Sequence, residues 1–137
     1  MKKILVLVIL VIIAIAAKLP KASKAEIARR GFTAAINKDT ESFVKMCDDN
    51  VVISIHSDDS EIPKETFKGK QGAREYMERR KTYETYNFTN MQFKELGEKV
   101  IVTGHFEGKL YGKPTYTNDY AGIAIFNGDK IQYYYAF

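Results

Sequence analysis

The chain has a single cysteine and no tryptophan among its 137 residues. One thiol, Cys47, cannot form an internal disulfide, which excludes a fold that depends on disulfides. Cys47 falls on the same apolar side of a predicted helix as Phe43 and Val44, so we expect a buried, unreactive thiol. A chain of this length is expected to form one domain with a core large enough to need no metal or disulfide.

A strong excess of charge of one sign is also missing. The formal net charge is +4, and Lys2 and Lys3 at the start of the chain supply part of it. A field this weak does not indicate nucleic acid, and no basic cluster is interleaved with aromatic residues. The basic runs at residues 29–30 and 79–81 fall in predicted helices, and we interpret them as solvent-facing. We therefore expect no nucleic-acid partner.

The first twenty residues have the composition of a targeting segment. Lys2 and Lys3 precede an unbroken apolar run at residues 4–17 that ends in an Ala-x-Ala pattern, as in a cleaved signal peptide. A helix of that length spans about 21 Å, less than the roughly 30 Å of a bilayer core. Positive charge directly after the run opposes translocation, at Lys18, Lys21 and Lys24. A signal peptide and an uncleaved signal anchor at residues 1–20 both stay open. Either places the domain outside the cytoplasm, secreted or tethered, with membrane contact only through residues 4–17.

Three helices are predicted after this leader. Ser23 and Glu26 have the spacing of a capping box, and Asp39 can cap the helix that follows. Small residues such as Gly31 on the apolar side of the first helix allow a close approach to its neighbour. The helices are expected at about residues 23–37, 39–47 and 70–83, the last with Tyr76 and Tyr83 on its apolar side.

Strands are predicted where the apolar period changes to two and β-branched residues gather. They are expected at about residues 51–55, 86–96, 100–107, 116–126 and 130–137, with a bulge between Phe88 and Met91. Residues 48–50 are read as a turn, and Asn127-Gly128 predicts a hairpin with a type I′ turn. Helices segregated from a run of antiparallel strands define an α+β domain, here at residues 23–137.

Five short stretches, spread over about residues 25–137, carry a resemblance to a known family. They are Phe32-Thr33-Ala34-Ala35-Ile36-Asn37-Lys38-Asp39, Asp48-Asp49-Asn50-Val51-Val52, Phe67-Lys68-Gly69-Lys70-Gln71-Gly72-Ala73, Asn118-Asp119-Tyr120-Ala121 and Asn127-Gly128-Asp129-Lys130-Ile131. In this order and spacing they resemble the SnoaL-like branch of the nuclear transport factor 2-like superfamily. The resemblance implies a cone in which three N-terminal helices pack on a strongly curved, mostly antiparallel sheet, with a pocket at its open end. Some members are isomerases, cyclases, dehydratases or hydrolases, and many only bind ligands, dimerise or assemble with partners, so the fold leaves the function open.

The best-understood chemistry on this fold, that of ketosteroid isomerase, does not fit this sequence. That chemistry uses a carboxylate base and acidic hydrogen-bond donors. The base would fall near Ser54 or Ile55, the tyrosine donor at Phe32, and the protonated acid near Gly122. None of these side chains has the required group, so we do not expect this isomerase reaction.

The remaining catalytic candidates are Asp119 and His105. Asp119 shares its strand face with Thr117, Ala121, Ile123 and Ile125, a mostly apolar set that we expect to face inward. A carboxylate at the end of that set is either a pocket acid with a raised pKa or an exposed residue at the mouth of the strand. His105 is either a general base near Asp119 or a surface histidine paired with a neighbour.

The candidate ligand-binding residues are aromatic: Phe32, Tyr76, Tyr83 and Tyr120. They line a pocket if the cone is open and form plain core if it is filled. His56 with Asp58 and Asp59 resembles a fragment of a metal site, but its spacing is not that of a complete one, so we predict no metal and no cofactor. Asn87-Phe88-Thr89 matches the glycosylation pattern, which matters only in a host that glycosylates exported proteins.

These observations lead to one expected function and two alternatives. We expect an exported domain that binds a small apolar or amphipathic ligand, or a protein partner, in or beside its cone pocket without turnover. One alternative is a cyclase-, isomerase- or hydrolase-like enzyme that uses Asp119 and His105. The other is an interaction module that dimerises through the exposed face of its sheet. Alternation on the last strand places Ile131, Tyr133, Tyr135 and Phe137 on one face and Gln132, Tyr134 and Ala136 on the other, which favours a homodimer because both faces carry apolar side chains.

Overall fold

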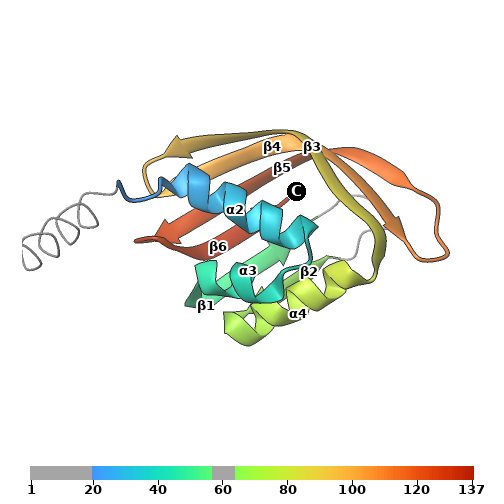
Figure 1. Cartoon of the computed structure of the whole chain (residues 1–137), viewed down its shortest axis with the longest axis horizontal. Helices are drawn as coiled ribbons and strands as arrows, with labels where there is room; N and C mark the ends of the chain where they lie inside the picture. The colour runs from blue at the N-terminus through green and yellow to red at the C-terminus, as the bar shows by residue number, and fades with distance from the viewer. Residues whose placement is uncertain (1–19, 57–63) are drawn as a thin grey trace, which may run out of the picture.

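The computed structural model describes residues 20–56 and 64–137. Within these residues three helices cover one face of a curved sheet (Figure 1). The helices are α2 (Lys24–Ile36), α3 (Thr40–Met46) and α4 (Gly69–Lys81). Each was predicted from the sequence, although α4 ends before Tyr83, which instead begins a strand. The α+β architecture is thereby confirmed.

The caps at the starts of α2 and α3 follow from the residues at their N-termini. The Ser23 hydroxyl accepts a hydrogen bond from the Glu26 backbone N–H at 3.1 Å, and the Asp39 carboxylate accepts one from Ser42 N–H at 3.1 Å. Both bonds satisfy backbone donors that a helix start leaves free. The Glu26 carboxylate accepts a hydrogen bond from Arg30 at 3.0 Å, so it takes part in a surface ion pair.

Six strands form one mixed sheet in the order β2-β1-β6-β5-β4-β3. β1 and β6 run parallel, and the other neighbours are antiparallel. The strands are β1 (Cys47–Ile55), β2 (Glu65–Lys68), β3 (Tyr83–Leu96), β4 (Lys99–Leu110), β5 (Tyr116–Asn127) and β6 (Lys130–Ala136). The mostly antiparallel sheet was expected; β2 was not, because only Phe67 of its four residues is buried. β1 also begins earlier than predicted, with a register shift between Cys47 and Val52 where we expected a turn.

Two hairpins join β3 to β4 and β5 to β6, and each turns on a glycine with positive φ. Gly97 has φ +60° and Gly128 has φ +61°. The second hairpin pairs Asn127 with Lys130, so Gly128 and Asp129 are its central residues. A positive φ at the first central position alone is the pattern of a type II′ turn. The hairpin is as predicted. Its central residues are Gly128 and Asp129 rather than Asn127 and Gly128, so the predicted type I′ turn was wrong.

Register shifts decide which side chains face the helices. The bulge expected between Phe88 and Met91 is present, with a shift between Thr89 and Gln92 and Asn90 at φ +54°. A second shift separates the pairs Ile125–Tyr133 and Phe126–Ile131. The extra residue on β6 reverses the alternation there, so the expected grouping of Ile131 with Tyr133 was wrong. Ile131 is buried under the helices with Tyr134 and Ala136.

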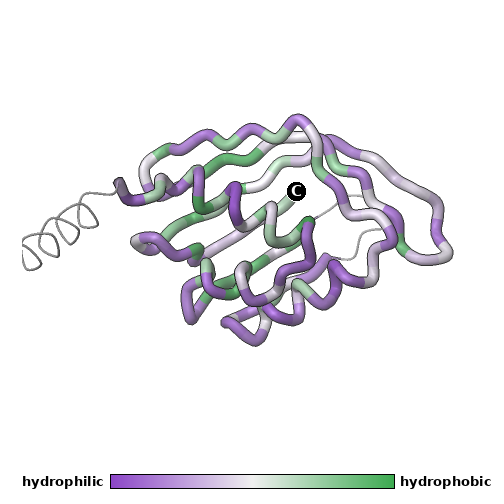
Figure 2. The backbone as a smooth tube through the Cα atoms, viewed as in Figure 1, coloured by the Kyte–Doolittle hydropathy of each residue, from purple (hydrophilic) through white to green (hydrophobic). Residues whose placement is uncertain are grey.

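The core lies between the helices and the inner face of the sheet. α2 presents small residues to it, and a methyl group on Gly31 would lie 3.7 Å from the Ile131 Cδ1. Figure 2 shows apolar stretches on the central strands behind α2 and hydrophilic stretches along α4. The inner face of β5 carries Gly122, Ala124 and Phe126, all buried. The outer face carries Ile123 and Ile125, so our assignment of the isoleucine face as inward was wrong.

No helix in residues 20–56 and 64–137 is long and apolar enough to cross a membrane. The predicted leader segment at residues 4–17 lies outside the described part of the chain, as do Asp58 and Asp59. The prediction of a signal peptide or anchor therefore stays a prediction.

Candidate functional site

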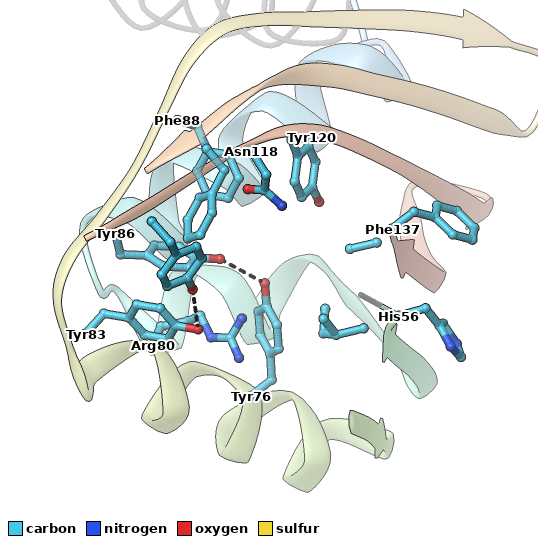
Figure 3. A pocket seen from close by; sticks show the side chains of 13 residues that line it. His56, Tyr76, Arg80, Tyr83, Tyr86, Phe88, Asn118, Tyr120 and Phe137 are labelled. Atoms are coloured by element: carbon cyan, nitrogen blue, oxygen red, sulfur yellow. Dashed lines mark hydrogen bonds between the residues drawn. The ribbon is translucent and has the colours of Figure 1, made fainter. Parts of the chain in front are cut away.

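An aromatic cavity lies between α4 and the inner face of the sheet (Figure 3). Its volume is about 50 Å³, which is small beside the several hundred Å³ of a typical drug-sized pocket. Most of its wall is aromatic: Tyr76, Tyr83, Tyr86, Phe88, Phe106, Tyr116 and Tyr120. It reaches the surface beside His56 and Phe137, whose rings stack with centroids 6.4 Å apart. We call this site the aromatic cavity.

Strand alternation positions much of this wall. Tyr86 and Phe88 on β3 point to the same side of the sheet, as do Tyr116, Asn118 and Tyr120 on β5. α4 supplies Tyr76 and Arg80, one helical turn apart, from the opposite wall (Figure 3). β1, β4 and β6 also contribute to the wall, so the cavity needs the folded sheet to bring these separated segments together.

The phenol hydroxyls form two hydrogen-bonded pairs. Tyr76 and Tyr86 share a hydrogen bond with their oxygens 3.4 Å apart, and Tyr116 donates to the Tyr83 oxygen at 3.1 Å. Burial raises the pKa of Tyr76 and of Tyr120 well above the usual value. The pKa of Tyr116 is raised mainly by burial and to a smaller extent by its hydrogen bond to Tyr83. At neutral pH these phenols are therefore uncharged and keep their hydroxyl protons.

Arg80 is the buried charge of the cavity, with only 7% of its surface exposed. Its guanidinium carbon lies 4.4 Å from the Tyr76 ring centroid, and 5.6 and 5.5 Å from those of Tyr83 and Tyr86. Burial acts to lower the pKa of Arg80, but the three surrounding phenols outweigh it and the net pKa is raised. The side chain therefore stays a cation within an aromatic wall.

Two buried polar atoms at this site have no hydrogen-bond partner among the described residues. They are Arg80 Nε and Asn118 Oδ1. Both side chains line the aromatic cavity, Arg80 from α4 and Asn118 from β5 (Figure 3). Because a buried polar group without a partner costs about 1–3 kcal/mol, such atoms at a cavity wall indicate a place where a ligand or water can supply the bond.

The comparison with family models decides the family. A model described as "SnoaL-like domain" matches residues 28–134. The chain belongs to the SnoaL-like domain family. The expected resemblance is confirmed over most of the described chain, whereas no curated protein matches it.

Solved structures share the fold of this SnoaL-like domain at low sequence identity. An NTF2-like protein from Burkholderia xenovorans LB400 is 15% identical with a TM-score of 0.73, over 83% of this chain and 87% of that one. A putative polyketide cyclase from Pseudomonas putida KT2440 is 15% identical with a TM-score of 0.68, over 85% and 92%. TerC, co-crystallised with polyporic acid, is 17% identical with a TM-score of 0.71, over 84% and 91%. At these identities the likeness concerns the fold alone.

Three of the four predicted ligand-binding residues line the aromatic cavity of this SnoaL-like domain: Tyr76, Tyr83 and Tyr120. The fourth, Phe32 on α2, lies behind them, with its ring centroid 5.7 Å from that of Tyr120 and 5.3 Å from that of Phe88. Phe32 therefore supports the wall from the core side. Whether these residues bind a ligand stays a prediction.

Asp119 and His105 lie on the other side of the sheet. They face each other across β5 and β4, with His105 Nδ1 3.5 Å from Asp119 Oδ1. The Asp119 side chain is fully exposed and that of His105 is 44% exposed. The expected proximity is present, and of the two settings left open for Asp119 the structure shows the exposed one; neither residue lines the aromatic cavity. Catalysis by this pair stays a prediction.

Sequence reasoning missed Arg80 and Asn118. We read residues 79–81 as a solvated basic run, which holds for Arg79 and Lys81 but is wrong for Arg80. The spacing contained the signal: Ala73, Tyr76, Met77 and Arg80 fall on one helix face and all are buried. Asn118 lies in the stretch Asn118-Asp119-Tyr120-Ala121 beside the more conspicuous Asp119, which points to the opposite face.

Proposed function

We propose that this SnoaL-like domain binds a small amphipathic ligand in the aromatic cavity without turning it over. The observation that carries this proposal is the pairing of an aromatic wall with two partnerless polar atoms, Arg80 Nε and Asn118 Oδ1. An apolar wall with a few convergent polar groups is the general form of a small-molecule site.

The composition of the wall supports binding over turnover. Among the described residues that line the cavity there is no carboxylate, and the phenols keep their protons at neutral pH. A general base has to accept a proton near the operating pH, and among the described lining residues only His56, at the rim, has a side chain suited to that. The solved relatives support ligand capacity on this fold, since TerC was co-crystallised with polyporic acid.

Native mass spectrometry of the full chain purified from its host tests the proposal. We expect a small molecule to co-purify and to be lost in Asn118→Leu, which removes one partnerless polar group and fills space with an apolar side chain. Asp119→Asn, one residue away on the exposed outer face, is the matched control and should retain the molecule. Repeated absence of any bound molecule, with no thermal shift in a library of small amphipathic compounds, would contradict ligand binding.

We also propose that the domain forms a homodimer through the outer face of its sheet. That face carries five partly exposed apolar side chains that follow one another in register across β4, β5 and β6. They are Ile101, Ile123, Ile125, Tyr133 and Tyr135. The described helices all cover the opposite face (Figure 1), and a contiguous exposed apolar patch is typical of an interaction surface. Sedimentation of Ile123→Glu should show monomers, while Thr117→Glu on the same strand face should sediment like the unmodified protein. A monomeric unmodified protein would contradict this proposal.

Finally, we propose that the domain works outside the cytoplasm. Support comes from the positively charged start and the apolar run at residues 4–17. N-terminal sequencing of the protein from fractionated host cells tests it: a new start after residue 17 indicates a cleaved leader, and a full-length membrane-bound chain indicates an anchor. A full-length chain in the cytoplasmic fraction would contradict export.

A further inference from the structure

The charge of Arg80 is balanced only in part by the described residues. Its nearest carboxylate among the described residues is Glu65, with Oε2 3.7 Å from Arg80 Nη2, which is too long for a hydrogen bond. The other Glu65 oxygen lies 2.9 Å from Nη1 of the exposed Arg79. Glu65 is thus directed to Arg79 at the surface, and Arg80 keeps donors that face the cavity.

The aromatic neighbours of Arg80 leave its Nε donor unused. Tyr76 lies against the guanidinium at 4.4 Å, a contact of charge with an aromatic face. A guanidinium carries its N–H groups in its own plane, and they match the two oxygens of a carboxylate. The Arg80 Nε, which has no partner among the described residues, is one donor of such a fork.

Asn118 supplies a second and different polar group. Its Oδ1 is buried without a partner in the described part of the chain, and an amide oxygen needs a donor such as a hydroxyl. A ligand that satisfies both walls therefore carries an anionic acceptor for Arg80 and a hydroxyl for Asn118, joined by an apolar body that fits the aromatic sides.

The single positive charge that Arg80 offers favours a ligand with one negative charge. Arg80 is the only lysine or arginine among the described lining residues, and Glu65 already lies 3.7 Å away. A phosphate dianion would bring a second negative charge with no second buried cation to receive it. A carboxylate carries a single charge and has the two-oxygen geometry that suits arginine.

We infer that the aromatic cavity recognises a small hydroxylated carboxylic acid, with its carboxylate on Arg80 and its hydroxyl at Asn118. This inference rests on the proposed ligand binding and names the class of ligand. The cavity volume of about 50 Å³ restricts the buried part to a small group. A longer acid extends outward past His56 and Phe137, which line the opening.

Isothermal titration calorimetry on the full chain tests the inference with defined probes. These are benzoate, the three monohydroxybenzoates, and neutral benzamide. We expect at least one hydroxybenzoate to bind, and benzamide to bind about 10- to 100-fold more weakly, the range for a charge-assisted hydrogen bond. Arg80→Met should abolish this preference for the acid, and Arg80→Lys should keep part of it because lysine retains charge without the fork. Arg79→Met, an exposed neighbour on the same helix, is the matched control and should bind like the unmodified protein.

Asn118→Leu separates the two contacts. It should bind benzoate but lose the preference for a hydroxybenzoate over benzoate. Circular dichroism checks that each variant is folded. If Arg80→Met is unfolded, the comparison of Arg80→Lys with the unmodified protein tests the inference.

The outcomes distinguish this inference from the proposed function. Equal affinity for benzamide and benzoate, or undiminished benzoate binding by Arg80→Met, would overturn the carboxylate assignment while ligand binding stands. If no probe binds, the molecule that co-purifies decides: an acid supports the inference, a neutral molecule overturns it. If no probe binds and nothing co-purifies, both the inference and the proposed function are wrong.

Discussion

Gly72 on α4 lies directly against the backbone of Phe67 on β2. A methyl group at Gly72 would stand 2.9 Å from the Phe67 carbonyl carbon, closer than carbon atoms normally approach. The Gly72 hydrogen thus allows the first turns of α4 to pack onto the edge strand. This contact helps to hold α4, and with it Tyr76 and Arg80, against the sheet.

We expect Gly72→Ala to lower the free energy of unfolding by about 1–3 kcal/mol, the usual range for overpacking a close contact. Gly31→Ala on α2 is the matched control, because its new methyl would lie an ordinary 3.7 Å from Ile131 Cδ1. Alanine is the better helix former by about 1 kcal/mol, so this control should be stabilised. Urea denaturation measures both changes, and a stabilised Gly72→Ala would show that β2 moves aside easily.

Cys47 should be unreactive in the native protein. It is 1% exposed, and burial raises its pKa to about 12, a rise that the charges of Lys70 and Lys130 only partly oppose. At pH 8 the thiolate fraction is then roughly a thousandfold below that of an ordinary cysteine. Labelling with a thiol reagent should be slow for the folded protein and fast in guanidinium chloride. Rapid labelling of the folded protein would contradict the burial of this side chain.

Much of the fold could be predicted from the sequence, because its signals are local. Ser23 and Asp39 mark helix starts, and Gly97 and Gly128 mark the two hairpins. These residues act through their own backbone or within a few positions of it. β2 lacked such a signal, since a short edge strand with one buried residue has no readable period.

The faces of the strands were harder to predict because they depend on distant packing. On β5 the larger side chains of Ile123 and Ile125 point outward, and the small Gly122 and Ala124 point to the helices. Hydrophobicity alone assigns the isoleucines to the core, but a Cβ at Gly122 would lie only 3.0 and 3.2 Å from the Tyr120 and Tyr134 hydroxyls, so tyrosines from two strands take that inner space. The same alternation places Asp119 on the exposed outer face and Asn118 at the wall of the aromatic cavity.

The stability provided by the Asp39 cap should depend on pH. Hydrogen bonds from the Ser42 hydroxyl and backbone N–H, in that order of effect, hold the pKa of Asp39 below its usual value. A carboxyl whose pKa is lower in the folded state stabilises it above the unfolded pKa, and that contribution disappears as the pH falls through the folded pKa. Asp39→Asn keeps a good cap residue without a titrating group.

Thermal melts of the two proteins between pH 2 and pH 7 check this prediction. The difference in melting temperature between the unmodified protein and Asp39→Asn should be constant above about pH 5 and shrink below about pH 4. Glu41 titrates in the same range, because Arg74 lowers its pKa, but it is present in both proteins and its effect cancels. A midpoint difference that does not change with pH would contradict the role of the charged cap.

Removing the Arg80 charge should not destabilise the empty domain. The buried guanidinium has lost most of its water and has no carboxylate at hydrogen-bond distance in residues 20–56 and 64–137, while Glu65 retains Arg79 at 2.9 Å when Arg80 is replaced. Methionine preserves much of the apolar stem of arginine. The free energy of unfolding of Arg80→Met should therefore be within about 1 kcal/mol of that of the unmodified protein, or higher. Glu65→Gln should cost more, about 1–3 kcal/mol, because it takes the nearest negative charge from a buried cation. Chemical denaturation of ligand-free protein compares the two, and a larger loss for Arg80→Met would mean that this arginine is held in the core for stability and not for binding.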